Sequence, residues 1–346
     1  MSKERNKDSI NNLSFVKTIL MILVVLDHSM SFWTGEWFTK NPVFLAEPLK
    51  LFSSFLGSFH TYSFTLVSGY LFYHLRCEKE KYAHYLLFIK QKAVRLLVPY
   101  AFIAAVWVIP WSCLFLSSPQ GTTLVSKYIL GTSPSQLWFL LMLFGVFAIF
   151  HPLTGFFQEK HIFGAITVIG FYGIGIVGQT AMTNYFQIFR TCMYFPLFWL
   201  GFKLRQFERQ GVQRIPVWVW ALVYVLVLFL FQYTSRFDSV IFKLLHIGFE
   251  FVLHIVGALT AFAVLQKIAD KTHWRDSNIF GLISKLSFPV YLFHQQVLYI
   301  FIYLLNGLLN PYVHVIVNFV GALGISLGLS AVLRRFRITR FLLGEK

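Results

Sequence analysis

The first long apolar stretch of the chain, residues 14–33, contains side chains that could do chemistry. It reads SFVKTILMILVVLDHSMSFW and carries Lys17, Asp27 and His28. A charged group at the centre of a bilayer costs about 2.5–3.5 kcal/mol or more, so a membrane span that keeps one is a candidate functional site. An imidazole titrates near neutral pH and can take a proton and give it back within one reaction. His28 is therefore the first candidate for a functional residue.

Lys17 and His28 share one face of the expected helix. They are separated by 28 − 17 = 11 positions, which at about 100° per residue is three full turns plus about 20°. At about 1.5 Å per residue they lie roughly 16 Å apart along the axis, so Lys17 is near one membrane surface and His28 is well inside. Two alternatives stay open: Lys17 reaches out to the interface, and His28 is a neutral imidazole bonded to a neighbouring helix. Asp27, about 100° around the helix from His28, either supports its partner or points elsewhere.

Few other titratable residues fall inside apolar stretches. Of the fourteen acidic residues, Asp27 and Glu250 lie well within them. The remaining basic or titratable residues there are His60, Arg190, His246, His254, Lys285 and His294, with Arg95 at a boundary. Such groups should face the interior of a helix bundle or a wet cavity.

One group of these residues has a spacing that raises the possibility of a metal site. His246, Glu250 and His254 follow one another at intervals of four residues, which places them on one helix face. The outer two are roughly 12 Å apart along the axis, too far for one ion to bind all three. We expect no metal, and instead a polar seam that faces an acceptor cavity.

The elements that must position these residues are membrane helices. The chain has 346 residues, of which 57% are hydrophobic and only 13% charged, and it contains 40 Phe. This is more apolar surface than one soluble core can hide, so the composition predicts a polytopic membrane protein. The formal charge of +16 does not indicate a nucleic-acid partner, because the basic residues sit between long apolar runs. The three cysteines form no CxxC pair and are given no role.

Ten apolar stretches are long enough to cross a bilayer as helices. They lie near residues 13–33, 50–73, 94–116, 136–153, 162–178, 186–204, 216–233, 240–266, 279–305 and 312–333. We therefore expect one all-α domain over residues 1–346, a bundle of about ten transmembrane helices with a short cytoplasmic segment 1–12 and a cytoplasmic tail 334–346. This orientation leaves only Lys40, Lys127 and Arg236 in the outer connections, as the positive-inside rule requires.

Six short motifs occur in a characteristic order along these spans. They are Lys17 with His28, FTLVSGY (Phe64 to Tyr70), RLLVPY (Arg95 to Tyr100), LWFLLML (Leu137 to Leu143), RTCMYFPLFWLG (Arg190 to Gly201) and SFPVYLFH (Ser287 to His294). From about residue 12 to 333 the chain resembles the acyltransferase-3 family of integral membrane O-acyltransferases. Lys17 stands where many members have Arg, and we expect the polysaccharide O-acetyltransferase type, standing alone without a soluble esterase-like (SGNH) domain after the last span.

The resemblance implies an activity and its partners. An acyl group, usually acetyl from acetyl-CoA, is moved to a hydroxyl of a surface polysaccharide or lipid-linked sugar precursor at the bacterial cytoplasmic membrane. It implies acyl-CoA, the glycan acceptor and membrane lipid as partners and no permanently bound cofactor. The acceptor, the acylated position, the donor's chain length, an acyl-enzyme and the oligomeric state stay open. Because none of the three cysteines, including Cys192 within the fifth motif, matches a position that characterises the family, direct transfer is favoured.

Acyl transfer needs a base, a group that stabilises an oxyanion, and cations for the phosphates of the donor. With the resemblance, His28 is the expected base, and Lys17 and Arg95 are expected to bind acyl-CoA and assist catalysis. Arg95 is the better candidate for a phosphate or an oxyanion, because its guanidinium stays charged and offers a planar fork. Ser68 either permits close helix packing or lines the donor tunnel. The expected acceptor-binding residues are Trp138, Arg190, His294 and Glu250.

Two other classes of function fit part of the pattern. A transporter or flippase for glycan precursors would also have ten spans and interior His and Arg residues. Such proteins often carry corresponding broken helices in two halves, and the sequence shows no internal symmetry. A structural or sensing membrane protein would leave the ordered motifs unexplained.

Overall fold

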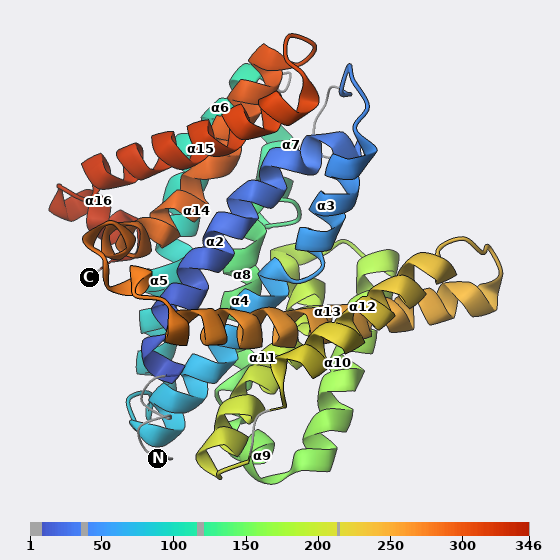
Figure 1. The fold of residues 1–346 in the computed structure, drawn as a ribbon. Helices are drawn as coiled ribbons and strands as arrows, with labels where there is room; N and C mark the ends of the chain where they lie inside the picture. Colours follow the sequence, from blue (N-terminus) through green and yellow to red (C-terminus); the bar gives the residue numbers. More distant parts are fainter. Residues whose placement is uncertain (1–8, 36–40, 116–120, 213–214, 346) are drawn as a thin grey trace.

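The structure is a computed structural model that describes residues 9–35, 41–115, 121–212 and 215–345. Within these ranges every regular element is a helix, which confirms the all-α class (Figure 1). The helices are α2 (Leu13–Met30), α3 (Glu47–Gly57), α4 (His60–Tyr73), α5 (Tyr85–Ile103), α6 (Ile109–Phe115), α7 (Gly121–Leu124), α8 (Trp138–Phe150), α9 (Thr154–Glu159), α10 (His161–Ala181), α11 (Ile188–Arg209), α12 (Val217–Thr234), α13 (Val240–Lys271), α14 (Asn278–Leu305), α15 (Pro311–Leu333) and α16 (Arg337–Leu342). Short 3₁₀ and π turns extend several of them.

Seven helical segments of the described chain are long and apolar enough to cross a membrane. They contain α2, α5, α10, α12, α13, α14 and α15. The second, fourth and sixth expected spans correspond to α4, α8 and α11, which are shorter or more polar and pack against one another and α5 inside the bundle. The total of about ten spans and the cytoplasmic side of both ends stay predictions, and residues 1–8, Lys40 and Lys346 lie outside the described residues.

The prediction that residues 50–73 form a single second span was wrong. The chain leaves the helix between α3 and α4, where Phe59 has φ −136°. Contacts from distant helices hold the break: Ser58 Oγ lies 2.6 Å from the hydroxyl of Tyr224, and the Ser58 carbonyl accepts a hydrogen bond from Nδ1 of His254 at 2.9 Å. The break makes His60 the first residue of α4.

The expected third span, residues 94–116, also begins earlier than the apolar pattern indicates. Helix α5 starts at Tyr85 and therefore includes Lys90 and Lys92, which precede the expected span and were assigned to the connection before it. Because these lysines are helical, their side chains are directed to defined faces of α5.

Helices α4 and α11 cross closely at two glycines, Gly69 and Gly201. A methyl group on Gly69 would overlap the carbonyl of Phe198, and one on Gly201 would overlap the carbonyl of Leu66. Small residues at such crossings let two backbones approach within a membrane. This crossing fixes the α4 face that carries Ser68 relative to the rest of the core.

Helix α2 lies in the middle of the bundle, as Figure 1 shows, while α12 and α13 extend together to one side. It packs against α3, α4, α13, α14 and α15. Most of its side chains are buried within the protein, including Asp27. The polar residues of the first span therefore face protein partners.

Candidate active site

His28 of α2 and His294 of α14 form a pair of nearly parallel imidazoles that meet edge to edge. Their ring centroids lie 5.1 Å apart with planes tilted by 13°. Nδ1 of His28 is 2.8 Å from Nε2 of His294, a hydrogen-bond distance. His294 is fully buried, whereas His28 keeps partial exposure.

The neighbours of this pair determine which nitrogen of His28 carries a lone pair. Nδ1 of His294 lies 2.8 Å from the carbonyl oxygen of Tyr291, and a carbonyl can only accept, so this nitrogen carries the hydrogen. In a neutral ring Nε2 of His294 is then the acceptor, and Nδ1 of His28 donates to it. The lone pair of a neutral His28 is consequently on Nε2, the nitrogen that could take a proton.

Asp27 points away from this pair. Its Oδ2 lies 2.7 Å from Nε2 of His60, and its Oδ1 accepts a hydrogen bond from Ser53 at 2.6 Å. All three side chains are buried. The His60 ring meets the His28 ring edge-on, with centroids 6.3 Å apart, and its Nδ1 has no hydrogen-bond partner among the described residues. His60 is one of the titratable residues expected inside an apolar stretch, and no role was predicted for it.

A cavity of about 350 Å³ brings together three of the predicted residues, Lys17, Ser68 and Arg95. Met21 and Val24 also line it, and they continue the α2 face that leads from Lys17 to His28. Two further cations of the lining, Lys92 and Lys285, were not among the predicted site residues; no acidic side chain of the described chain lines the cavity. The other lining residues include Thr61, Phe64, Tyr82, Phe139, Phe147, Ser284, Ser287, Phe288 and Tyr291. The cavity is suited to an anion with an apolar extension.

Lys92 is held among aromatic rings at this cavity. Its ammonium lies 3.9 Å from the ring centroid of Phe147, 5.1 Å from that of Tyr82 and 5.3 Å from that of Phe88. Ring faces attract a cation at these distances. The sequence does contain a signal for Lys92. It lies three residues before Arg95, and this spacing places the two side chains near one helix face if the helix begins before Lys92.

Arg95 has two contacts that orient its guanidinium. The group lies 4.4 Å from the ring centroid of Phe288 on α14. Its Nη1 donates a hydrogen bond to the carbonyl of Gly344 at 2.7 Å. Arg95 remains exposed and can therefore meet a ligand that enters the cavity.

Three of the four predicted acceptor residues belong to one continuous stack of rings and charges. The guanidinium of Arg190 lies 4.6 Å from the Trp138 ring centroid. Trp138 contacts the ring of Tyr194 at 5.5 Å, Tyr194 stacks on Tyr62 at 4.7 Å, and Tyr62 stacks on His254 at 3.7 Å. The carboxylate of Glu250 lies 3.7 Å from His254. We call these six residues the aromatic wall. The fourth predicted residue, His294, lies apart from it beside His28.

The suspected metal spacing on α13 brings Glu250 and His254 within 3.7 Å of each other but directs His246 to other partners. Nδ1 of His246 lies 3.2 Å from the carbonyl of Phe231, and Nδ1 of His254 bonds the carbonyl of Ser58. In the described chain no group of three or more His, Cys, Asp or Glu side chains could hold a metal ion.

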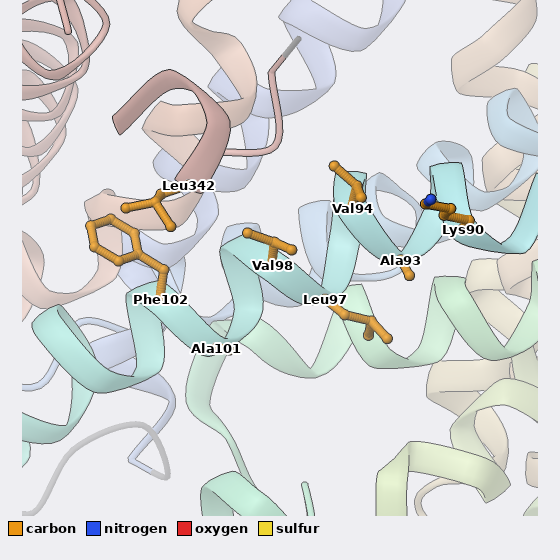
Figure 2. A pocket seen from close by; sticks show the side chains of 8 residues that line it. All are labelled: Lys90, Ala93, Val94, Leu97, Val98, Ala101, Phe102 and Leu342. Atoms are coloured by element: carbon orange, nitrogen blue, oxygen red, sulfur yellow. The ribbon is translucent and has the colours of Figure 1, made fainter. Parts of the chain in front are cut away.

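A second hollow, of about 480 Å³, lies along the opposite side of α5, where Leu342 of α16 covers part of it (Figure 2). Its lining is Lys90, Ala93, Val94, Leu97, Val98, Ala101, Phe102 and Leu342. Lys90 is its only charged side chain, and the rest of the lining is aliphatic or aromatic.

Comparison with known proteins gives one match. A family model described as "Acyltransferase domain" matches residues 10–335, nearly the whole chain. No curated protein and no solved structure matches the chain.

Proposed function

Because the chain belongs to the acyltransferase-3 family of membrane acyltransferases, we propose that it transfers an acetyl group from acetyl-CoA to a hydroxyl of a surface polysaccharide or lipid-linked sugar. The proposed location is the bacterial cytoplasmic membrane, which agrees with a multi-pass helical protein.

The observation that carries the proposal is the hydrogen-bond order from Tyr291 through His294 to His28. It leaves the basic lone pair on Nε2 of His28. His28 is also one helical turn beyond Val24, on the α2 face that lines the cation-rich cavity. A base next to a site for an anionic donor is the arrangement that acyl transfer from CoA requires.

The donor would bind with its phosphates at the cationic part of this cavity, at Lys17, Lys92 and Arg95. Arg95 presents a fork that matches two phosphate oxygens, and the lysines act as point charges. The apolar lining from Met21 to Val24 suits the thin arm that carries the thioester toward His28. Ser68 lines the same passage.

The acceptor would bind at the aromatic wall. The ring of Trp138 provides a flat apolar surface, while the charges of Arg190 and Glu250 fix orientation through hydrogen bonds. The wall adjoins the cavity, because Thr61 lines the cavity and lies 3.2 Å from the hydroxyl of Tyr194. Donor and acceptor would therefore meet near the start of α4.

In the proposed reaction the acceptor oxygen attacks the thioester carbonyl and its proton passes to Nε2 of His28. The tetrahedral intermediate carries an oxyanion, which a nearby cation stabilises. The C–S bond then breaks, and the thiolate takes the proton back from Nε2. The products are the O-acetylated sugar and CoA, with His28 neutral again.

The test compares the wild-type protein with His28→Ala in membranes supplied with acetyl-labelled acetyl-CoA and extracted surface glycan. We expect the variant to lose about 10²–10⁴-fold in transfer rate, the usual contribution of a general base. His246→Ala is the matched control, because His246 bonds to Phe231 of α12 and belongs neither to the cavity nor to the wall. Retained transfer in His28→Ala removes His28 from the mechanism.

A second measurement separates an enzyme from the glycan transporter or flippase that the sequence also allows. A ligand that binds the folded state raises its melting temperature. We expect acetyl-CoA to stabilise the detergent-purified protein, whereas a transporter without a CoA site shows no such shift.

A further inference from the structure

The segment that follows α16 turns back and packs against α5. Leu343 is fully buried and Gly344 is buried, although both lie beyond the last span. Figure 2 shows the neighbouring Leu342 beside Phe102 of α5. A simple cytoplasmic tail, as expected for residues 334–346, would not be buried against α5 in this way.

The buried segment makes its closest polar contact with a residue of the proposed donor site. The carbonyl of Gly344 accepts a hydrogen bond from Nη1 of Arg95 at 2.7 Å. The approach depends on glycine: a Cβ at this position would lie 2.6 Å from the Arg95 carbonyl oxygen and 2.7 Å from Cγ of Pro99. Gly344 also has φ +74°, a conformation that side chains other than glycine's disfavour.

The next residue ties the segment to the end of α15. Oε2 of Glu345 accepts a hydrogen bond from Nε of Arg334 at 2.7 Å. The three residues Leu343, Gly344 and Glu345, here called the return segment, are thus held by a buried side chain, a backbone contact and an ion pair.

These contacts restrict the guanidinium of Arg95. Phe288 covers one face of it at 4.4 Å, and the Gly344 carbonyl takes one of its five N–H donors in the guanidinium plane. A planar fork binds phosphate well only when its plane is already set. With both contacts present, the remaining donors of Arg95 point in fixed directions from the cavity lining.

We infer that the return segment is part of the donor site and that Gly344 is a positioning residue, which holds Arg95 in the orientation that binds a phosphate of acyl-CoA. The inference rests on the proposed function. It assigns a binding role to backbone that lies outside the transmembrane bundle, about 250 residues from Arg95 in sequence.

The test is the kinetics of Gly344→Ala in detergent, with acetyl-CoA and the glycan acceptor varied separately. We expect KM for acetyl-CoA to rise about tenfold, the loss that corresponds to one charge-assisted hydrogen bond. The turnover number at saturating acetyl-CoA and KM for the acceptor should stay within about twofold, because the return segment touches neither His28 nor the aromatic wall.

Gly211→Ala is the matched control. Gly211 has φ +82°, similar to that of Gly344, but among the described residues other than its chain neighbours no atom lies within 4 Å of its Cβ position. It therefore tests backbone strain without the contact to Arg95, and we expect an unchanged KM for acetyl-CoA. Glu345→Gln is the milder variant: it weakens the anchor to Arg334 with no steric change, and KM for acetyl-CoA should rise about two- to threefold.

A double-mutant cycle with Arg95→Lys shows whether Gly344 acts through Arg95. In the Arg95→Lys background Gly344→Ala should add less than about twofold to KM, because the fork it positions is already absent. Full additivity of the two changes, or an unchanged KM in both Gly344→Ala and Glu345→Gln, overturns the inference. A wild-type protein that transfers no acetyl group and is not stabilised by acetyl-CoA overturns the proposed function, and this inference with it.

Discussion

His294 Nε2 lies 2.8 Å from His28 Nδ1, and the hydrogen of that contact belongs to His28 because His294 already donates to the Tyr291 carbonyl. The second imidazole therefore keeps the first in one tautomer and one orientation. A base that is oriented in this way loses activity when its orienting group is removed, even though the base itself remains.

His294→Phe should lower the transfer rate by about 10²–10³-fold at neutral pH, because His28 can then place its hydrogen on either nitrogen. His294→Gln should recover part of this loss, since its side-chain oxygen can accept from Nδ1 of His28. The rates of both variants, compared with His314→Phe as a control for a buried imidazole on α15, check the prediction. Equal rates for the Phe and Gln variants would speak against a tautomeric role.

Lys92→Met should raise KM for acetyl-CoA roughly tenfold with little change in turnover number, because the cavity loses one of its four positive charges. Lys92→Arg should retain most of the affinity. The control is Lys90→Met, since Lys90 lines the hollow on the opposite side of α5 (Figure 2). Equal effects at both lysines would indicate a general charge effect and not a binding role for Lys92.

Trp138→Ala should raise KM for the glycan acceptor and leave KM for acetyl-CoA unchanged. Stacking on an aromatic face contributes about 0.5–1.5 kcal/mol beyond the area buried, so an increase of at least about threefold is expected. Loss of the ring also removes the partner of Arg190, which lies 4.6 Å from it. Trp138→Phe should restore most of the affinity, and a change confined to the donor's KM contradicts the acceptor role.

The pKa of Glu78 predicts how the stability of the folded protein depends on pH. It lies past the end of α4, outside the spans, and accepts hydrogen bonds from Arg205 at 2.6 and 3.0 Å and from His74 at 2.9 Å. Burial raises the pKa of Glu78, but the bonds from Arg205 and His74 outweigh it and leave the pKa below its usual range. A carboxyl whose pKa is lower in the folded than in the unfolded state stabilises the fold above its unfolded pKa, and this contribution disappears as the pH falls through the folded pKa.

The melting temperature in detergent should therefore be constant near neutral pH and fall below the ordinary Glu pKa of about 4.3. Glu78→Gln should lose about 1.5–3 kcal/mol at neutral pH, the contribution of hydrogen bonds to a charged group, because buried Arg205 then keeps Glu208 at 3.2 Å as its carboxylate partner. The variant should also show a flatter profile in acid. Glu80→Gln makes the same change in net charge at an exposed position and serves as the control. If Glu78→Gln has the melting temperature of the wild-type protein, the ion pair between Glu78 and Arg205 does not stabilise the fold.

The parts of the site that follow from helical periodicity could be predicted from the sequence. Lys17 lines a cavity together with Met21 and Val24, as the shared face of Lys17 and His28 required. Arg95 and Ser68 line the same cavity. The catalytic and binding roles of these residues stay predictions.

Other parts depend on contacts that no local pattern encodes. The position of His60 beside Asp27 requires the helix break at Ser58 and Phe59, which Tyr224 and His254 hold from distant helices. Lys92 was missed because the apolar pattern begins after it, whereas α5 begins at Tyr85. The pairing of His294 with His28 joins residues 266 positions apart, and its predicted acceptor role remains untested.

The same separation has a consequence for biosynthesis. Helix α2 leaves the ribosome well before α14, which supplies His294. At about 5–20 residues per second, His28 waits roughly 10–50 s for its partner. Asp27 waits far less, because Ser53 and His60 follow within 33 residues. The emerging chain can thus pair its buried carboxylate early, whereas the contact between His28 and His294 forms only after α14 has been made.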